Sequence, residues 1–295
     1  MNFGNIEIDK IVAHWLSSKE ITLDVLRLDK IHPIISGNKA FKLKFYIAKA
    51  LLHSKSTIAT FGGAWSNHIV ATAFASKMAG LKSVGIIRGD QLPDLSTTLS
   101  SAIEYGMELH FVTRENYKDK GQLMKRYDSA DFFWINEGGY GELGAKGAEE
   151  ILQIVDTSNY THIVAAVGTG TMLAGLVRSA LPHQKIIGIS AMRGNFELEQ
   201  QVINLLPANN SYKLCIIHDY HFGGFGKHSQ QLLDFIKEMY KNHRLPLDIV
   251  YTGKLMYGVK DLISNNYFDI GSKLLIIHSG GLQGNSSLGD KVLTF

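Results

Sequence analysis

The stretch that decides the fold reads His162-Ile-Val-Ala-Ala-Val167-Gly168-Thr-Gly-Thr171-Met-Leu-Ala-Gly-Leu-Val-Arg-Ser-Ala-Leu181. Its first six residues predict a buried strand, its Gly-Thr-Gly-Thr segment predicts a tight loop, and Met172–Leu181 predicts a helix. A polar loop interrupts the apolar residues at once, so the stretch is too short to span a membrane. Strand, glycine-rich loop and helix in this order are typical of a parallel α/β protein.

The same alternation of short apolar runs and longer amphipathic runs extends over the rest of the chain. Further strands are predicted at Thr57–Phe61, Ser83–Ile87, Glu108–Val112, Lys185–Met192 and Lys273–Ser279. Further helices are predicted at Asn67–Ala79, Gln230–His243 and Lys254–Asn265. This pattern predicts βαβ units, in which helices cover both faces of parallel sheets.

Glycine pairs follow three of the predicted strands directly. Gly62-Gly63 follows Phe61, Gly168 begins the loop after Val167, and Gly280-Gly281 follows Ser279. In open α/β sheets, ligands bind beyond the carboxyl ends of the strands. We therefore expect these loops to converge on one crevice.

The overall composition describes a globular protein with little electrostatic bias. The 295 residues are 45% hydrophobic and 19% charged, with a formal net charge of +3. Without a basic run, this charge does not favour nucleic acid or an anionic membrane as a partner. The single cysteine, Cys215, excludes an internal disulfide, and residues 1–10 lack the pattern of a secretory signal. We expect a cytoplasmic protein.

A lysine stands at the start of a predicted helix in Ser36-Gly-Asn-Lys39-Ala-Phe-Lys42-Leu43. Asn38 is the expected N-cap, and apolar residues then recur at helical spacing. The positive end of the helix dipole lowers the pKa of an amine in the first turn, which suits a lysine that must react in its neutral form. An ordinary solvated lysine is the alternative for this motif taken alone.

Two loops have the properties of anion sites. Ser66-Asn67-His68 opens a helix after a glycine turn, where unpaired N–H groups can hold a carboxylate, although a simple helix cap is the alternative. Gly168-Thr169-Gly170-Thr171 has the form of a phosphate cradle at a helix N-terminus. It lacks the Gly-Lys-Ser/Thr of a nucleotide P-loop and the third glycine of a dinucleotide fingerprint. A site for one phosphate without ribose recognition fits best, and tight strand–helix packing is the alternative.

Other functional motifs are weak. Tyr251 and Ser279 each lie at the end of an apolar run, and each taken singly is best explained by packing. The sequence contains no Gly-x-Ser-x-Gly for a serine hydrolase, and His218 and His221 lack a third zinc ligand.

Taken in order, these segments resemble the 1-aminocyclopropane-1-carboxylate (ACC) deaminase and D-cysteine desulfhydrase family, which belongs to the tryptophan-synthase-β-like, fold type II pyridoxal-5'-phosphate (PLP) enzymes. The resemblance extends from Gly37 to about Leu288. It rests on five motifs, namely Gly-Asn-Lys39-x-x-Lys42-Leu, Gly-Gly-x-x-Ser66-Asn67, Gly168-Thr-Gly-Thr, Val-Tyr251-x-Gly-Lys254 and Ser279-Gly-Gly.

The resemblance implies roles for these residues. Lys39 carries PLP as a Schiff base and moves protons, and Asn67 hydrogen-bonds the phenolic oxygen of the cofactor. Ser66, Asn67 and His68 hold the substrate carboxylate. The cofactor phosphate is bound by the loop Gly168, Thr169, Gly170 and Thr171, with help from Lys42. Tyr251 lies beside the substrate as the acid–base partner of Ser66.

Two positions bear on the substrate. ACC deaminases have Glu where this chain has Thr252, and Leu where it has Ser279. A glutamate keeps the pyridine nitrogen of PLP protonated and makes the ring a deep electron sink, whereas a neutral hydroxyl does not. The chain also has Phe41 where the family often has Arg, and it lacks an expected tyrosine in the segment His221–Gly226. A PLP ring with an unprotonated nitrogen is a weaker electron sink. It suffices when an α-proton is removed and a good leaving group departs from the β-carbon.

The resemblance therefore predicts a PLP-dependent lyase or deaminase that catalyses β-elimination from D-cysteine. ACC ring opening is the alternative within the family, and a PLP-binding regulatory protein without turnover is the alternative of another class. The expected fold is α/β with two open parallel-sheet domains. Residues 1–51 and 135–295 form a large PLP-binding domain, and residues 52–134 form a small domain that closes the active-site cleft. Homodimerisation is expected by analogy.

Overall fold

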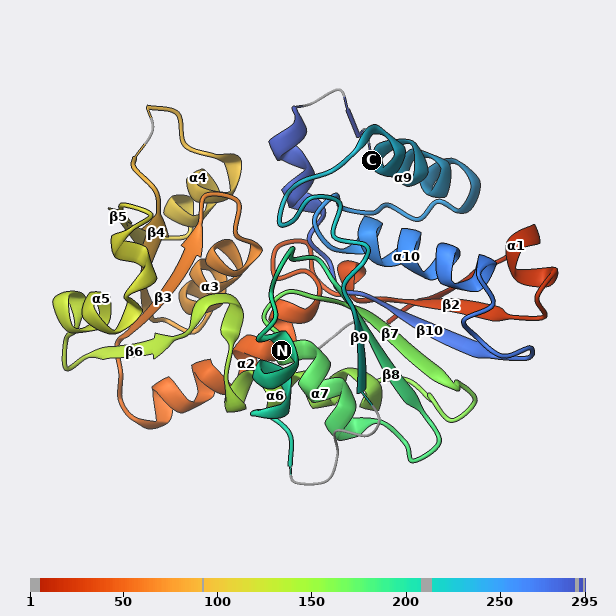
Figure 1. Cartoon of the computed structure of the whole chain (residues 1–295). Coiled ribbons are helices and arrows are strands. Elements are labelled where there is room, and N and C mark those ends of the chain that lie inside the picture. Colours follow the sequence, from red (N-terminus) through yellow and green to blue (C-terminus); the bar gives the residue numbers. More distant parts are fainter. Residues whose placement is uncertain (1–5, 92, 208–213, 290–291, 294) are drawn as a thin grey trace.

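The computed structural model describes residues 6–91, 93–207, 214–289, 292, 293 and 295. The chain forms two separate sheets flanked by helices (Figure 1). The strands are β1 Ile8–Ile11, β2 Thr22–Arg27, β3 Thr57–Gly63, β4 Lys82–Arg88, β5 Met107–Val112, β6 Phe132–Ile135, β7 His162–Val167, β8 Lys185–Ser190, β9 Leu214–Ile217 and β10 Lys273–His278. The α-helices are α1 His14–Ser17, α2 Asn38–Leu52, α3 Asn67–Met78, α4 Thr97–Glu104, α5 Lys120–Tyr127, α6 Glu142–Glu149, α7 Thr171–Ser179, α8 Leu198–Ile203, α9 Gln230–His243 and α10 Thr252–Ser264. Short 3-10 turns include η3 Glu137–Gly139.

The larger sheet has six strands in the order β1-β2-β10-β7-β8-β9. Every neighbouring pair is parallel except β1 and β2, which are antiparallel at one edge. Strand β10, near the C-terminus, is inserted between β2 and β7. It therefore pairs directly with β2, which lies near the N-terminus. This arrangement places the ends of β2, β10 and β7 side by side.

The larger sheet is buried on both faces because alternate residues of each strand point to opposite sides. Along β7, Ile163 and Ala165 join the core that includes α2, α6 and α7, while Val164 and Ala166 join the core that includes α9 and α10. Figure 1 shows α9 and α10 on one face of this sheet and α6 and α7 on the other. Two hydrophobic cores therefore cover the two faces of this sheet.

The smaller sheet has four parallel strands in the order β5-β4-β3-β6. One face packs against α3 and α4 through residues such as Ile69 and Leu99. The other face packs against α5 and the preceding turn through Phe61, Tyr117 and Leu123. These four strands lie within residues 57–135.

The predicted α/β fold with two mostly parallel sheets is confirmed. All six predicted strands and the four helices predicted with bounds are present, with ends displaced by up to two residues, and the helix predicted around Lys39 is α2. The prediction did not include β1, β2, β6 and β9, which are short or carry charged residues that interrupt the apolar pattern. The division into domains at residues 51/52 and 134/135 stays a prediction, and the first five residues of its large domain lie outside the described residues.

Gly37, just before α2, lies against Ser279, just after β10. Its φ is +71°, and a methyl group placed on it would come within 1.8 Å of the Ser279 carbonyl oxygen. The N–H of Asn38 donates to that same carbonyl at 3.2 Å. Only glycine combines this backbone conformation with this approach, so Gly37 sets where α2 begins.

We expect Gly37→Ala to destabilise the protein more than Gly80→Ala, which is a matched control. Gly80 has the same φ of +71° but nothing within 4 Å of a new methyl group. Gly80→Ala should cost about 1–2 kcal/mol, the price of a left-handed alanine. Gly37→Ala should add roughly 1–3 kcal/mol for overpacking. Denaturant unfolding of both variants measures the difference, and equal losses would contradict the role of the Gly37 contact.

Candidate active site

The predicted site residues gather beyond the carboxyl ends of β3, β7 and β10, around the first turn of α2. Lys39 is the second residue of α2. Asn38 is not the N-cap that the sequence predicted, because Gly37 takes that position and no side chain caps the helix. The Asn38 side chain instead accepts a hydrogen bond from Lys39 Nζ at 2.8 Å. Asn38 therefore orients the amine of Lys39.

Two lysines of α2 lie in surroundings that disfavour positive charge. Burial lowers the pKa of Lys39 to about 8, although the carboxylate of Asp248 acts in the opposite direction. Burial, and then the charge of Lys39, lower the pKa of Lys42 well below its ordinary value. Lys42 Nζ donates to the Gly138 carbonyl at 3.2 Å. Lys39 thus has a substantial neutral fraction near physiological pH, as a nucleophilic amine requires.

The Ser66-Asn67-His68 segment begins α3 on the smaller sheet. Ser66 is the N-cap residue, but its side chain makes no capping hydrogen bond, so the simple-cap alternative does not describe it. The Asn67 Oδ1 atom is buried and has no hydrogen-bond partner among the described residues. Because a buried polar atom is normally paired, this amide has unused capacity for a ligand.

His68 is buried beneath this turn with a defined tautomer. The Thr60 hydroxyl donates to the Ile135 carbonyl, so His68 Nε2 must donate to Thr60 Oγ1 at 2.8 Å. His68 Nδ1 is then a bare acceptor, and no partner for it is present among the described residues. Burial, together with the charges of Lys39 and Lys42, lowers the pKa of His68 well below its ordinary value. His68 is therefore a neutral neighbour of the two lysines.

The Gly168–Thr171 loop connects β7 to α7. Gly170, with φ of +80°, is the N-cap of α7, and Thr171 is its first residue. The hydroxyls of Thr169 and Thr171 lie 3.2 Å apart. Oriented N–H groups and hydroxyls at a helix N-terminus are the groups that bind a phosphate in proteins.

A second glycine turn, not recognised in the sequence, lies against the Gly168–Thr171 loop. In η3, Gly138 and Gly139 have φ of +67° and +73°. A methyl group on Gly138 would come within 2.8 Å of Thr169 Cγ2, and one on Gly139 would lie 3.5 Å from Lys42 Cδ. The Gly-Gly pair after β6 was a visible signal of this close approach.

Tyr251 lies against the Gly168–Thr171 loop. A methyl group on Gly168 would lie 3.1 Å from Tyr251 Oη. Burial, followed by the charges of Asp248 and Glu137, raises the pKa of Tyr251 above its ordinary value. Tyr251 therefore keeps its hydroxyl hydrogen. No hydrogen bond joins it to Ser66 in the structure as described, so the acid–base pairing of these residues stays a prediction.

Asp248 is a fully buried carboxylate that sequence reasoning missed. Its Oδ1 accepts from the N–H groups of Val250 and Tyr251, and its Oδ2 accepts from the N–H of Thr252 at 2.9 Å and from the Thr252 hydroxyl at 2.6 Å. The Thr252 hydroxyl also accepts from the Asp248 N–H at 2.8 Å. Its hydrogen is thus directed to Asp248. Sequence gave no signal for this, since Asp248 lies outside the quoted motif.

Ser279 directly follows β10. Its backbone carbonyl contacts Gly37 and Asn38, while its hydroxyl makes no hydrogen bond to the described residues. Two positions along, a methyl group on Gly281 would come within 3.0 Å of Asn67 Nδ2 and 3.4 Å of Asp248 Oδ2. The loop after β10 therefore meets both α3 and the segment before α10.

Lys254, in the first turn of α10, is also fully buried. Its ammonium donates to the carbonyls of Ala191, His221 and Gly224 at 3.4, 2.9 and 2.7 Å. These bonds hold the segment His221–Gly226, in which Phe225 packs edge-on against Tyr251 at 6.0 Å between ring centroids. An aromatic ring without a hydroxyl thus covers Tyr251.

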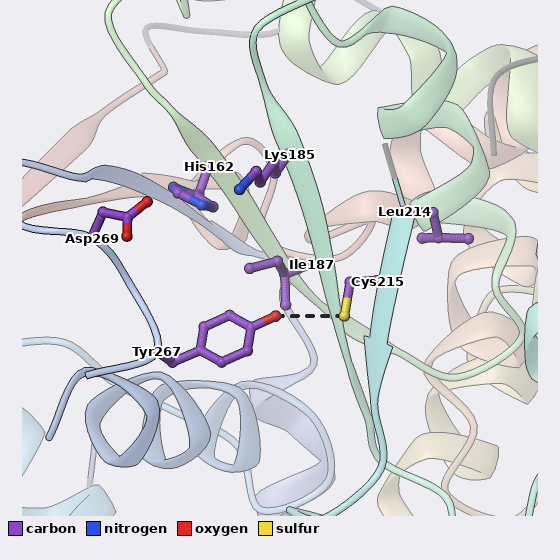
Figure 2. A pocket seen from close by; sticks show the side chains of 7 residues that line it. All are labelled: His162, Lys185, Ile187, Leu214, Cys215, Tyr267 and Asp269. Carbon is purple, nitrogen blue, oxygen red and sulfur yellow. Dashed lines mark hydrogen bonds between the residues drawn. The ribbon is translucent and has the colours of Figure 1, made fainter. Parts of the chain in front are cut away.

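Two other features lie apart from this site. A pocket of about 310 Å³ is lined by residues at the amino ends of β7, β8 and β9, with Tyr267 and Asp269 (Figure 2). It lies at the opposite end of these strands from the glycine-rich loops. His218 pairs with Glu199, and His221 accepts from the Gly223 N–H. The described residues contain no group of three or more metal-ligating side chains, and no described helix is long and apolar enough to cross a membrane.

Comparison with known proteins assigns the family. The model of the pyridoxal-phosphate dependent enzyme family matches residues 17–280. The chain therefore belongs to the pyridoxal-phosphate dependent enzymes, and it is an enzyme that uses PLP.

The most informative relatives belong to one branch of that family. A protein of Pyrococcus abyssi, named "Putative 1-aminocyclopropane-1-carboxylate deaminase", is 32% identical, and the match covers 94% of this chain and 90% of the relative. A bifunctional mitochondrial D-cysteine desulfhydrase/1-aminocyclopropane-1-carboxylate deaminase of Arabidopsis thaliana is 30% identical over 88% of this chain and 71% of its own length. The predicted resemblance to the ACC deaminase family is thereby confirmed.

Solved structures agree on the fold. An ACC deaminase homologue superimposes with a TM-score of 0.82 and 24% identity, over 98% of this chain and 93% of that chain. An L-serine ammonia-lyase from Rhizomucor miehei superimposes with a TM-score of 0.69 and 11% identity, over 95% and 94%. At these identities the likeness shows the fold, which is that of the fold type II PLP enzymes.

The site geometry fits PLP. The cofactor needs an amine, a partner for its phenolic oxygen and a cradle for its phosphate. Lys39 offers an amine of lowered pKa, Asn67 an amide with an unpaired buried oxygen, and the loop 168–171 a cradle beside the buried Lys42. All four features lie within one set of contacting loops.

We expect the attachment of PLP to the cofactor-free protein to become faster with rising pH and to level off above about 8. The neutral amine is the reactive form, and the pKa of Lys39 is about 8 instead of its ordinary value near 10.5. Stopped-flow absorbance at several pH values measures this rate. Asp248→Asn should move the midpoint to lower pH, because it removes the charge that favours protonated Lys39. A rate that still increases steeply above pH 10 would contradict the lowered pKa.

Proposed function

We propose that this enzyme catalyses β-elimination from D-cysteine, giving pyruvate, hydrogen sulfide and ammonia with uptake of one water. The observation that supports it best is the kind of group available to the pyridine nitrogen of PLP. Thr252 and Ser279 are neutral, and the buried carboxylate nearby, Asp248, already accepts four hydrogen bonds from residues 250–252. A weaker electron sink suits elimination of a good leaving group better than opening of a cyclopropane ring.

Of the two hydroxyls, Ser279 is the better partner for the pyridine nitrogen. The Thr252 hydroxyl gives its hydrogen to Asp248, so it has none to donate to an unprotonated nitrogen. The Ser279 hydroxyl has no competing hydrogen bond to the described residues. We therefore infer that Ser279 donates to the ring and that Thr252 fixes the turn carrying Tyr251.

The remaining residues would hold the cofactor and the substrate. Lys39 would bind PLP covalently, Asn67 its phenolic oxygen, and the loop 168–171 with Lys42 its phosphate. The N–H groups at the start of α3 have no intrahelical partners and would receive the substrate carboxylate beside the Ser66 hydroxyl. When bound, PLP supplies an electron-poor ring that stabilises negative charge at the α-carbon.

Proton transfer would fall to two groups of this chain. The pKa of Lys39 is about 8, so its Nζ would be largely neutral above that pH. Once released from the cofactor, Nζ would take the α-proton of the substrate. Tyr251 Oη, which burial and the neighbouring carboxylates keep protonated, would act with Ser66 in returning a proton. Phe225 on the ring of Tyr251 would keep water from this side of the site.

ACC ring opening is the second candidate, because the names of several relatives include that activity. It would require a neutral hydroxyl at the pyridine nitrogen to be compatible with cleavage of a strained carbon–carbon bond. Homodimerisation and a cytoplasmic location remain part of this proposal by analogy with the family.

Assays of the purified holoenzyme separate these candidates. D-cysteine should give pyruvate and sulfide, whereas L-cysteine and ACC should give little pyruvate or α-ketobutyrate. Lys39→Ala should abolish turnover and the absorbance of the lysine-linked cofactor, while Lys49→Ala, at an exposed position of the same helix, should leave both unchanged. Formation of α-ketobutyrate from ACC as the faster reaction would sink the D-cysteine proposal and leave the cofactor assignment intact.

The partner of the pyridine nitrogen has its own test. Ser279→Ala should change the 15N resonance of ring-labelled PLP with little loss of stability, because its hydroxyl binds no described residue. Thr252→Val should leave that resonance unchanged but cost about 1–3 kcal/mol, since it breaks two buried hydrogen bonds with Asp248. The reverse pattern, with the resonance moved by Thr252→Val alone, would refute the assignment to Ser279.

A further inference from the structure

A buried histidine outside the proposed chemistry lies where three site-bearing segments meet. His278 is the last residue of β10 and is 1% exposed. Its Nδ1 lies 3.1 Å from Asp29 Oδ1, and its Nε2 lies 2.7 Å from the Pro246 carbonyl oxygen. One imidazole therefore contacts both the segment before α2 and the segment before α10, and Ser279 follows it directly.

The two ring nitrogens have different partners. A carbonyl oxygen has no hydrogen to give, so Nε2 must donate to Pro246. Nδ1 lies 3.1 Å from Asp29 Oδ1 and 3.4 Å from the Gly280 nitrogen, whose N–H donates to it. Burial acts to raise the pKa of Asp29, but the hydrogen bond from Arg27 and the neighbouring charges lower it below its ordinary value.

His278 lies against a buried ion-pair network. Arg27, which pairs with His278 in the register of β2 and β10, binds the Asp29 carboxylate with two nitrogens at 2.6 and 2.8 Å. Arg27 also binds Asp9 on the edge strand β1. Arg27 and the two carboxylates thus form one network beside His278, and loss of Arg27 or Asp29 would leave a buried charge unpaired.

Each anchored segment carries part of the site. The segment after Asp29 leads to Lys39, and it is held further by the Ser36 hydroxyl donating to the Asp29 carbonyl and by the Gly37 N–H donating to Leu28. Pro246 is two residues before Asp248. A shift of either segment would move Lys39 or Tyr251 relative to the loop after β10.

We propose that His278 is a positioning residue for the PLP site, which holds the segments of Lys39, Ser279 and Tyr251 in register through its contact with Asp29 and its hydrogen bond to Pro246. It contacts neither cofactor nor substrate in this role. The inference depends on the PLP site but not on which amino acid is the substrate.

The test compares two buried histidines of the same sheet. His278→Gln removes the imidazole at the site end of β10, which contacts Asp29 and Pro246. His162→Gln alters a histidine that is 8% exposed at the opposite end of the neighbouring strand β7, bonded to Thr161 and packed on Phe268. Both should lower the melting temperature. Only His278→Gln should weaken PLP binding, by about tenfold or more as for supporting partners of other cofactor sites, and shift the absorbance of bound PLP.

A second variant provides a measurement if His278→Gln does not fold. Asp29→Asn removes the charge that faces His278 Nδ1 while keeping the shape of the side chain. It should weaken PLP binding, and in a folded double variant with His278→Gln the two losses should be less than additive, since both break one contact. PLP affinity and spectra as in wild type for whichever of these variants folds, or losses matched by His162→Gln, would overturn the proposal.

Discussion

The close approach of the loop after β10 to the start of α2 is the contact on which the site depends. Gly37 allows the Ser279 carbonyl to lie against the backbone and to accept the N–H of Asn38. A side chain at this position would push the first turn of α2, and with it Lys39, away from the sheet. Because β10 is inserted between β2 and β7, the same loop also lies beside the phosphate cradle. The C-terminal strand thereby fixes a lysine more than two hundred residues away in the chain.

Buried charge is the second constraint. Lys42 and Lys254 are almost wholly inside, and Lys39 is half-buried, while Asp248 is the fully buried carboxylate that faces Lys39 and Lys254. Lys254 is satisfied by three backbone carbonyls, but Lys42 has the Gly138 carbonyl alone among its described hydrogen bonds. A phosphate bound at the adjacent loop would supply the missing negative charge. The energetic cost of burying Lys42 is thus consistent with a site shaped for an anionic cofactor.

Both sheets contribute residues to the candidate site. The larger sheet carries Lys39, the Gly168–Thr171 loop and the loop of Ser279, all beyond the carboxyl ends of β2, β7 and β10. The smaller sheet provides Ser66 and Asn67 at the start of α3, and Asn67 meets the larger sheet at Gly281. The two sheets also share an apolar core, in which Ile58 and Ile135 of the smaller sheet join the core that includes α2, α6 and α7.

The sequence by itself determined the α/β class, the glycine-rich loops and the identity of Lys39 as the candidate amine. These features depend on patterns within the sequence, namely the spacing of apolar residues, the residue types that form turns and the order of the five motifs. Only the tertiary structure decided which groups these side chains contact and hydrogen-bond. It directed the Thr252 hydroxyl to Asp248 and made Gly37 the N-cap in place of Asn38. It also joined His278 to Asp29 across 249 positions of sequence. Hydrogen-bond direction and burial depend on which segments meet in space, and sequence periodicity carries no information about those meetings.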